Sequence, residues 1–174
     1  MDSSKPNLQR VVIIGNSGSG KSHLAQELSK RLRSEILHLD QLFWEPGGFG
    51  KKRSPEVVHE EVKQFSLRER WIVEGVFGEL AATALENATA LIFLNKEWTE
   101  CEIALKRRGS ESAKQHDAEQ AEKHFQELLL WAKAYPDREN SRSLKGHSRL
   151  FSEFQKEKFE FRDRNQTEAW IKSL

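Results

Sequence analysis

One eight-residue stretch restricts the fold of this chain more than any other feature: residues 15–22 read GNSGSGKS and fit the pattern G-x-x-x-x-G-K-[ST]. Four consecutive apolar, β-branched residues, 11–14, come directly before it and are typical of a strand buried on both faces. After it, Leu24, Leu28 and Leu32 recur at every fourth position and indicate one face of a helix. A strand, this loop and a helix in succession predict a phosphate-binding loop rather than a chance glycine turn.

The residue types in this stretch suit contact with phosphate. Its glycines lack Cβ atoms and permit positive φ, so several backbone N–H groups can surround phosphate oxygens. The helix that begins near Lys21 adds its free N–H groups and its dipole. We expect Lys21 to reach the β- and γ-phosphates and the Ser22 hydroxyl to ligate Mg²⁺. The predicted nucleotide-binding residues here are Gly15, Asn16, Ser17, Gly18, Ser19, Gly20, Lys21, Ser22 and His23.

Length and charge bound the remaining possibilities. The 174 residues are enough for one compact domain and short for two, so we expect a single domain over residues 1–174. A formal net charge of +1 gives no electrostatic footprint for nucleic acid or an anionic membrane, and no apolar stretch approaches transmembrane length. With one cysteine, Cys101, no intrachain disulfide can form. Because no secretory leader is recognisable either, we expect a cytoplasmic protein.

Apolar runs alternate with helical patterns along the chain. The runs that predict strands are 11–14, 35–39, 71–74, 90–94 and 159–161, and the last of these, in an alternating stretch, is the candidate for an edge. The predicted helices are 21–32, 55–69, 79–87, 97–108, 119–134 and 166–173. This alternation favours an α/β fold in three layers, built on a parallel sheet of about five strands.

Two segments interrupt this alternation. Residues 45–54 form a glycine-rich, basic loop, and residues 109–118 are polar with almost no apolar positions. In α/β proteins, ligands bind outside the carboxyl ends of the strands. We therefore expect these segments to act as a substrate cover and a lid.

Acidic residues follow two of the predicted strands. Asp40 could activate an acceptor hydroxyl or hold a Mg²⁺-bound water, or it could simply cap a turn. Glu74 occupies the position of a Mg²⁺-organising carboxylate, with a structural role as the alternative. Nearby, Phe43 and Trp44 could stack on a flat acceptor or belong to the core. We interpret His38 as a hydrogen-bonded structural histidine.

Two further motifs bear on nucleotide recognition. Asn95-Lys96 resembles the start of the guanine-reading pattern N-K-x-D, but Trp98 stands where that pattern needs a carboxylate, so a guanine site is not predicted. Basic residues flank segment 109–118 on both sides, where they could clamp a transferring phosphoryl group or form a solvated basic face. These residues are Arg107, Arg108, Arg138 and Arg142.

Together these motifs resemble the small P-loop kinases of the adenylate-kinase and shikimate-kinase type. They are most similar to the group known as DNA topology modulation proteins, or adenylate-kinase-like P-loop ATPases. The matching pieces are IIGNSGSGKS, HLDQLFW, RWIVEG, LKRRG and AYPDRENSR, which run over nearly the whole chain. The resemblance implies a doubly wound P-loop NTPase fold that binds ATP and Mg²⁺, with an acceptor region near 40–70 and a short lid near 109–118.

The same resemblance implies roles for individual residues. It places Glu74 near Mg²⁺ and turns Asp40 toward the acceptor. The basic residues would lie near ATP or its phosphates, and the stretch 162–165 would lie beside the adenine. The implied nucleotide contacts outside the loop are Arg107, Arg108 and Arg164, and the implied contacts to the phosphates after the lid are Arg138 and Arg142.

One departure from the group separates two functional hypotheses. The group ends its third strand with Asp-Gly-Asn-Tyr, whereas this chain has Glu74-Gly75-Val76-Phe77 and so lacks two polar side chains. The first hypothesis is a Mg²⁺-dependent kinase that transfers a phosphoryl group from ATP to a small-molecule acceptor. Its catalytic residues would be Lys21, Asp40, Arg138 and Arg142. The alternative is a nucleotide-binding regulator that binds or slowly hydrolyses ATP without an acceptor.

Overall fold

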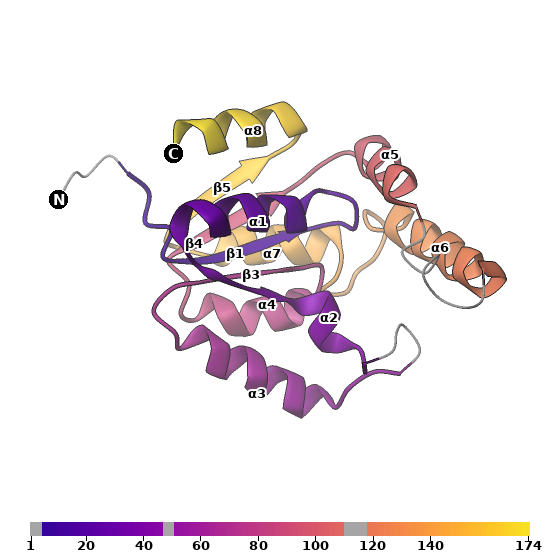
Figure 1. Cartoon of the computed structure of the whole chain (residues 1–174), viewed down its shortest axis with the longest axis horizontal. Coiled ribbons are helices and arrows are strands. Elements are labelled where there is room, and N and C mark those ends of the chain that lie inside the picture. The colour runs from indigo at the N-terminus through magenta and orange to yellow at the C-terminus, as the bar shows by residue number, and fades with distance from the viewer. Residues whose placement is uncertain (1–4, 47–50, 110–117) are drawn as a thin grey trace.

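Five parallel strands form one sheet in the order β2-β3-β1-β4-β5 (Figure 1). The computed structural model describes residues 5–46, 51–109 and 118–174. The strands are β1 Arg10–Gly15, β2 Glu35–His38, β3 Trp71–Gly75, β4 Ala90–Leu94 and β5 Glu157–Phe161. This arrangement confirms the predicted α/β fold with a parallel five-stranded sheet, and it places the weakest predicted strand, β5, at an edge.

Helices cover both faces of this sheet (Figure 1). The helices within the described residues are α1 Lys21–Leu32, α2 Leu39–Phe43, α3 Pro55–Ser66, α4 Gly78–Leu85, α5 Trp98–Arg108, α6 Ala118–Lys133, α7 Leu144–Glu153 and α8 Arg164–Ser173. Helices α1 and α8 pack on one face, whereas α3, α4 and α7 pack on the other. These are the three layers that the alternating sequence predicts.

The structure adds two helices that the sequence analysis did not predict. Helix α2 has only five residues, too few to show a helical period. Helix α7 has few apolar side chains, Leu144, Leu150 and Phe151, but it is amphipathic, and the Ser143 side chain caps its start by accepting a hydrogen bond from the Gly146 N–H at 3.0 Å. The predicted helix 55–69 was also too long, because α3 ends at Ser66.

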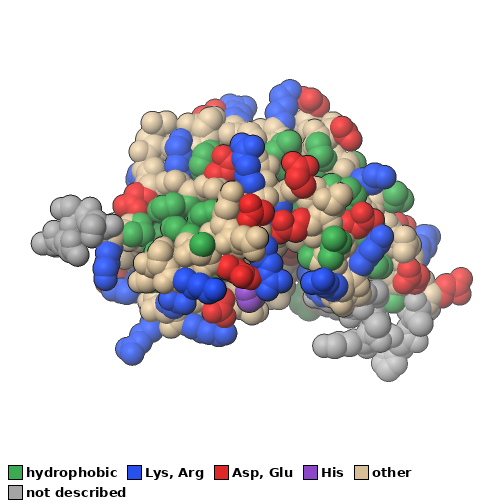
Figure 2. All heavy atoms as spheres, turned by 90° about the horizontal axis from the view of Figure 1, so that it is seen from above, with side chains coloured by type: hydrophobic (Ala, Val, Ile, Leu, Met, Phe, Trp, Pro, Cys, Tyr) green, Lys and Arg blue, Asp and Glu red, His purple; other side chains and the backbone are tan. Residues whose placement is uncertain are grey.

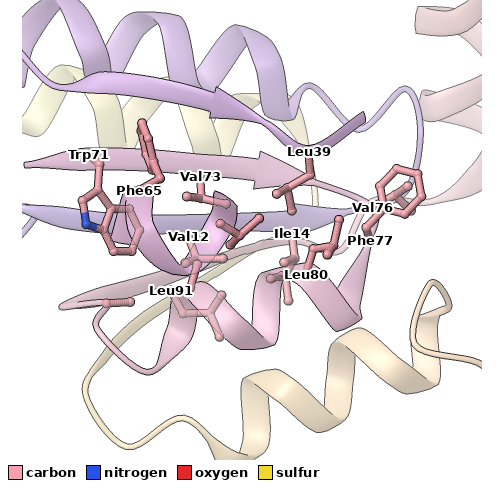
Figure 3. Close-up of a cluster of buried hydrophobic side chains, with 14 of the residues drawn as sticks. Val12, Ile14, Leu39, Phe65, Trp71, Val73, Val76, Phe77, Leu80 and Leu91 are labelled. Atoms are coloured by element: carbon pink, nitrogen blue, oxygen red, sulfur yellow. The ribbon is translucent and has the colours of Figure 1, made fainter. Parts of the chain in front are cut away.

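The core lies on both sides of the central strands. Residues Val11 to Ile14 of β1 have no solvent exposure, as a strand covered on both faces requires. Figure 3 shows Val12, Ile14 and Leu91 of the sheet gathered with Leu80 of α4 in the larger cluster. This packing holds the strands rigidly, so the residues at their carboxyl ends have fixed positions.

Strand register brings the predicted functional residues to one edge of the sheet. Ile13 of β1 pairs with Glu74 of β3, and Glu74 pairs with His38 of β2. The predicted phosphate-binding loop leaves β1 two residues later, and α2 begins directly after His38. The loop, Glu74 and the start of α2 therefore lie next to one another.

The outer surface is mixed in charge. On the face seen in Figure 2, lysine and arginine side chains are interspersed with aspartate and glutamate side chains. Within the described part of the chain, no helix combines the length and apolar character needed to cross a membrane.

Candidate functional site

The loop between β1 and α1 depends on glycine. Gly18 and Gly20 have φ of 80° and 94°, in the left-handed region that other residues rarely adopt. A Cβ on Gly18 would also lie 2.4 Å from the backbone oxygen of Cys101 in α5. Helix α1 starts at Lys21 directly after Gly20, with no acidic residue in its first turn. Its free N–H groups can therefore attract an anion without competition from a carboxylate of the helix itself.

Asn16 fixes the loop from the inside. This buried side chain accepts a hydrogen bond from the Ser17 N–H at 2.8 Å and donates one to the Ala132 carbonyl oxygen at 2.9 Å. The second contact joins the loop to the carboxyl end of α6, more than a hundred residues away in sequence. The predicted phosphate loop is thus shaped by contacts that do not involve phosphate.

Lys21 folds back over this loop. Its side chain is buried, and its ammonium group donates a hydrogen bond to the Asn16 carbonyl oxygen at 2.7 Å. The carbonyl occupies the kind of position that a phosphate oxygen could take, because both are acceptors for an ammonium donor. His23, the last of the predicted loop residues, is exposed on the outer side of α1.

Ser22 and His38 both bind the carboxylate of Glu74. The Ser22 hydroxyl donates to Glu74 Oε1 at 3.0 Å, and His38 Nδ1 lies 2.6 Å from the same oxygen. Burial by itself raises the pKa of Glu74, but the hydrogen bond from His38, the charge of Lys21 and the bond from Ser22 outweigh burial and lower it. The hydrogen bond to Glu74 raises the pKa of His38 against the effect of burial. His38 therefore has the structural hydrogen bond that we expected from its position.

Asp40 is the second carboxylate at this edge. Burial raises its pKa, whereas the positive charge of Lys21 and the backbone N–H of Val76 act in the opposite direction. Glu74 adds to the rise by repulsion, and the charge of Arg108 lowers it. Lys21 and Glu74 are thus close enough to influence the ionisation of Asp40.

Two oxygen atoms at this edge are candidates for a Mg²⁺ shell. Glu74 Oε2 and Asp40 Oδ1 are shielded from solvent, and neither has a hydrogen-bond partner among the described residues. A buried carboxylate oxygen without a partner is costly, and a hard cation or its bound water satisfies such an oxygen. Among the described residues, no group of three or more histidine, cysteine, aspartate or glutamate side chains forms a complete metal site. The donor set fits a Mg²⁺ ion that keeps waters and binds phosphate oxygens, as Mg²⁺ usually does.

The predicted arginine clamp has protein partners in this structure. Arg138 donates hydrogen bonds to the backbone oxygens of Trp131 and Arg142, and its guanidinium lies 3.8 Å from the centre of the Trp131 ring. Arg142 binds Glu79 through Nε at 2.8 Å, and through Nη2. Both guanidinium groups therefore contact the protein rather than pointing into open solvent.

The other predicted basic residues lie on the surface. Arg107 and Arg108 are exposed in the last turn of α5, where the helix dipole also favours cations. Arg164 is exposed at the start of α8 and pairs with Glu168 at 2.5 Å. The charge of Arg108 reaches the site, because it lowers the pKa of Asp40. Most of the predicted lid, residues 110–117, lies outside the described residues.

Aromatic side chains form one wall near Asp40. Phe43 stacks on Phe77 with 4.3 Å between ring centres, and Trp44 meets the edge of Phe43. The guanidinium of Arg142 lies 4.4 Å from the Phe77 ring and 4.6 Å from the Phe43 ring. Phe77 is buried, so it serves the core, whereas Phe43 and Trp44 are half-buried.

Sequence reasoning missed two residues behind this wall. Tyr135 and His147 are buried and bind each other at 2.6 Å, and His147 also binds the Val76 backbone oxygen. Tyr135 lies within the stretch AYPDRENSR, in which the sequence analysis predicted roles only for Arg138 and Arg142. No local pattern could have identified His147, because its partner Val76 is 71 residues away.

A surface hollow lies away from the candidate site described above. It has a volume of about 720 Å³ and is lined by residues near both chain ends, including Asn7, Leu8, Phe159 and Trp170. Asn7 and Leu8 precede β1, and the lining also includes Glu157, the first residue of β5, so the hollow lies at the opposite end of the sheet from the predicted phosphate loop. It shares no lining residue with the site described above.

Solved structures show what this architecture is. No protein-family model matches the chain. A gluconokinase from Sinorhizobium meliloti has a TM-score of 0.54 at 14% identity, covering 97% of this chain and 94% of that one. Shikimate kinase from Acinetobacter baumannii, in complex with shikimate, has a TM-score of 0.52 at 16% identity, covering 96% and 90%. A sugar kinase from a Janibacter species has a TM-score of 0.52 at 13% identity, covering 96% and 92%. The chain therefore has the fold of P-loop small-molecule kinases.

One curated protein also matches part of the sequence. The tRNA dimethylallyltransferase of Chlorobium chlorochromatii is 34% identical over 84 residues, which make up 47% of this chain. The matched stretch is 27% of that protein, so the chain spans about a quarter of the relative's length. This partial match does not carry the relative's activity over to the chain.

Proposed function

We propose that this protein is a Mg²⁺-dependent kinase that transfers the γ-phosphoryl group of ATP to a hydroxyl group of a small-molecule acceptor. One observation carries the proposal: Lys21, Ser22, Glu74 and Asp40 converge at one edge of the sheet, and two of their carboxylate oxygens are buried without described partners. In a purely structural cluster, the buried carboxylate oxygens would have hydrogen-bond partners within the protein. A site that binds phosphate and a cation would leave them available.

Each residue of the site then has a distinct task. The loop amides and Lys21 hold the β- and γ-phosphates once Lys21 exchanges the Asn16 carbonyl for a phosphate oxygen. Ser22 and Glu74 hold the cation shell, and His38 fixes the orientation of Glu74. The bound Mg²⁺ would neutralise charge on the phosphate oxygens.

Asp40 faces the acceptor in this proposal. Its carboxylate accepts a hydrogen bond from the acceptor hydroxyl and takes the proton as the new O–P bond forms and the bond to the leaving ADP oxygen breaks. The raised pKa of Asp40 makes it a better base than an exposed aspartate. Phe43, in the same short helix as Asp40, and Trp44, directly after it, would contact an apolar part of the acceptor.

The arginines stabilise the transferring group. Arg138 and Arg142 would exchange their present partners, backbone oxygens and Glu79, for phosphate oxygens. Arg107 and Arg108 would approach ATP from the end of α5, and Arg164 would lie beside the base. The five sequence motifs further support a place in the adenylate-kinase-like group, with ATP as the nucleotide.

A regulator that binds ATP without an acceptor is the second candidate. Val76 and Phe77, which replace two polar residues of the group, are both buried in the core cluster. They contribute packing where the group has polar side chains. A protein that retained nucleotide binding but lost its acceptor contacts would show this change.

Release of ADP from Mg-ATP separates the two candidates. The purified protein is tested across a panel of nucleosides, nucleoside monophosphates and small hydroxy acids. Lys21→Ala is the test variant, and Lys30→Ala is the matched control, because Lys30 is an exposed lysine on the same helix. A kinase shows one acceptor class that raises ADP release, with the rise lost in Lys21→Ala and kept in Lys30→Ala. ATP binding with no response to any acceptor favours the regulator.

A further inference from the structure

The carboxyl end of β4 and the helix α5 pack against the predicted phosphate loop (Figure 1). A Cβ on Gly15 would lie 2.6 Å from the backbone oxygen of Leu94, the last residue of β4. A Cβ on Gly18 would lie 2.4 Å from the backbone oxygen of Cys101 in α5. Lys96 belongs to the short segment between these two contacts, so its backbone is held beside the loop.

The Lys96 side chain reaches the end of this loop. Its ammonium group lies 3.9 Å from the position that a Cβ on Gly20 would take, and Gly20 is the N-cap of α1. The Lys96 side chain is only 7% exposed, so its charge lies within the protein and not in open solvent. The loop therefore has a second lysine ammonium group close to it, in addition to that of Lys21.

Glu100 is the partner of Lys96 in this structure. Its Oε1 accepts a hydrogen bond from Lys96 Nζ at 2.7 Å, and its side chain is 35% exposed. The carboxylate also lies in the first turn of α5, where the helix dipole favours an anion. Glu100 would keep this contact with the dipole, and its contact with water, if Lys96 turned away from it.

Lys96 lies at the positive ends of two helices. Its ammonium group is next to the first turn of α1, and it binds Glu100 in the first turn of α5. Both dipoles favour anions there and disfavour a lysine. The burial of a lysine also costs desolvation energy, which one carboxylate repays only in part. A bound polyphosphate would remove this disadvantage, because it places negative charge where the two helix ends and the lysine meet.

We propose that Lys96 is a second phosphate-binding lysine, which exchanges Glu100 for the α- or β-phosphate of the bound nucleotide. This inference rests on the proposed function for the nucleotide itself. In a loop of this pattern the backbone N–H groups hold the α- and β-phosphates, whereas the motif lysine, here Lys21, reaches the β- and γ-phosphates. Because Lys96 lies next to Gly20 of the loop, we expect it to act on the same two phosphates as the loop amides.

This role differs from the one that the sequence pattern suggested. The sequence analysis singled out Asn95-Lys96 only as the start of an incomplete guanine-reading pattern. A contact between Lys96 and phosphate does not depend on which base the nucleotide carries. The missing carboxylate at Trp98 therefore does not weaken the inference.

Binding of Mg-ADP and Mg-ATP tests the role of Lys96 without any acceptor. Lys96→Gln removes the charge of the side chain, and Lys96→Arg keeps it. A second lysine–glutamate pair four residues apart, Lys106 and Glu102, lies on α5 with 2.8 Å between the charged atoms and supplies the controls Lys106→Gln and Glu102→Gln. Calorimetric titration measures the affinity of each variant for each nucleotide.

We expect Lys96→Gln to bind both nucleotides roughly 10- to 100-fold more weakly, as for the loss of one charge-assisted hydrogen bond. The ratio of the ATP and ADP affinities should stay as in the wild type, because both nucleotides carry the α- and β-phosphates. Lys96→Arg should recover most of the loss, and both control variants should bind like the wild type. Wild-type affinity for ADP in Lys96→Gln, or a loss confined to ATP, overturns the inference.

Glu100→Gln separates a phosphate contact from a purely structural ion pair. Removal of the competing carboxylate frees Lys96, so we expect this variant to bind ADP roughly two- to fivefold more tightly than the wild type. An ion pair that only held the start of α5 in place would give unchanged or weaker binding, and that result overturns the inference. Glu100→Gln also decides the question if Lys96→Gln does not fold.

The inference and the proposed function fail in different ways. A wild-type protein that binds neither ADP nor ATP overturns the proposed function and the inference together. A wild-type protein that binds both, with Lys96→Gln unaffected, overturns only the inference and leaves the proposed function in place.

Discussion

The Ser22 hydroxyl donates a hydrogen bond to Glu74 Oε1 at 3.0 Å and thereby joins the start of α1 to the end of β3. The two residues are 52 positions apart in sequence. His38 holds the same oxygen from β2, which leaves Oε2 without a partner within the described residues. One carboxylate thus connects three elements and retains a free oxygen at the phosphate loop.

This arrangement predicts a Mg²⁺ dependence that Glu74 controls. Glu74→Gln keeps the shape of the side chain but removes its charge, and we expect the Mg²⁺ concentration for half-maximal turnover to rise roughly 10- to 100-fold. Magnesium titrations of ATP turnover measure the shift. Glu27→Gln, a charge change on the surface of α1, is the control and should leave the midpoint in place. An unchanged midpoint in Glu74→Gln would assign Glu74 a purely structural role.

The two inner glycines of the phosphate loop should differ in their tolerance of alanine. Both have positive φ, so either substitution costs about 1–2 kcal/mol of backbone strain. Gly18→Ala also drives a Cβ to 2.4 Å from the Cys101 oxygen, which adds roughly 1–3 kcal/mol, whereas Gly20→Ala meets nothing closer than the Lys96 ammonium at 3.9 Å. Urea unfolding of both variants measures the difference. Equal losses of stability would contradict the packing of the loop on α5.

The buried imidazole of His147 predicts a loss of stability on acidification. Its pKa is 6.5 when exposed and about 4 in the fold, so the unfolded state binds more protons between these values. The contribution of His147 is complete above pH 6.5 and declines as the pH falls toward 4. From pH 6.5 to about pH 5 the loss is about 2 kcal/mol.

Unfolding of the wild type and of His147→Gln at a series of pH values checks this expectation. The difference between the two free energies of unfolding should shrink as the pH falls through this window, because glutamine does not titrate. Glu74 and Glu79, whose pKa values are lowered, act in the same direction but mainly below their unfolded value of 4.5. A difference that is independent of pH would show that His147 does not titrate as its burial implies.

Arg142 should matter for turnover more than for folding. Its planar guanidinium binds Glu79 and lies over the rings of Phe43 and Phe77, where the proposed function places the acceptor. Arg142→Lys keeps the charge but loses the fork and the stacking, and we expect kcat to fall at least roughly tenfold. Arg149→Lys, on the exposed side of α7, is the control. Full turnover combined with a lower melting temperature in Arg142→Lys would make the arginine a clamp between α4 and the segment before α7.

The sequence predicted most of the fold because its signals are local. An apolar strand, a glycine loop and an amphipathic helix each appear within one short window, and the same holds for the other strands. Helix α7 was missed although its few apolar residues lie on one face and Ser143 is a good capping residue for its start, so its signal was present in the sequence. The predicted ends of some elements also differ from the observed ends. Helix α3 ends at Ser66, whose carbonyl oxygen accepts a hydrogen bond from the Trp71 indole N–H instead of continuing the helix.

The site could be predicted only in part, for the same reason. The phosphate loop, Glu74 and Asp40 lie at strand ends, and strand ends can be located from sequence. The contacts of His147 with Tyr135 and with the Val76 backbone oxygen join separate segments and have no local pattern. The present partners of Arg138 and Arg142 also depend on tertiary packing, so the sequence indicated basic residues around a lid but not what they bind.

The hydrogen bond from Asn16 to the Ala132 carbonyl oxygen attaches α6 to the loop near one end of the helix. Helix α6 has 16 residues and is therefore about 24 Å long, and the phosphate loop binds it within two residues of its carboxyl end. Most of α6 therefore extends away from this contact and away from the sheet (Figure 1). A rotation of about 10° there would move the opposite end of the helix by roughly 4 Å.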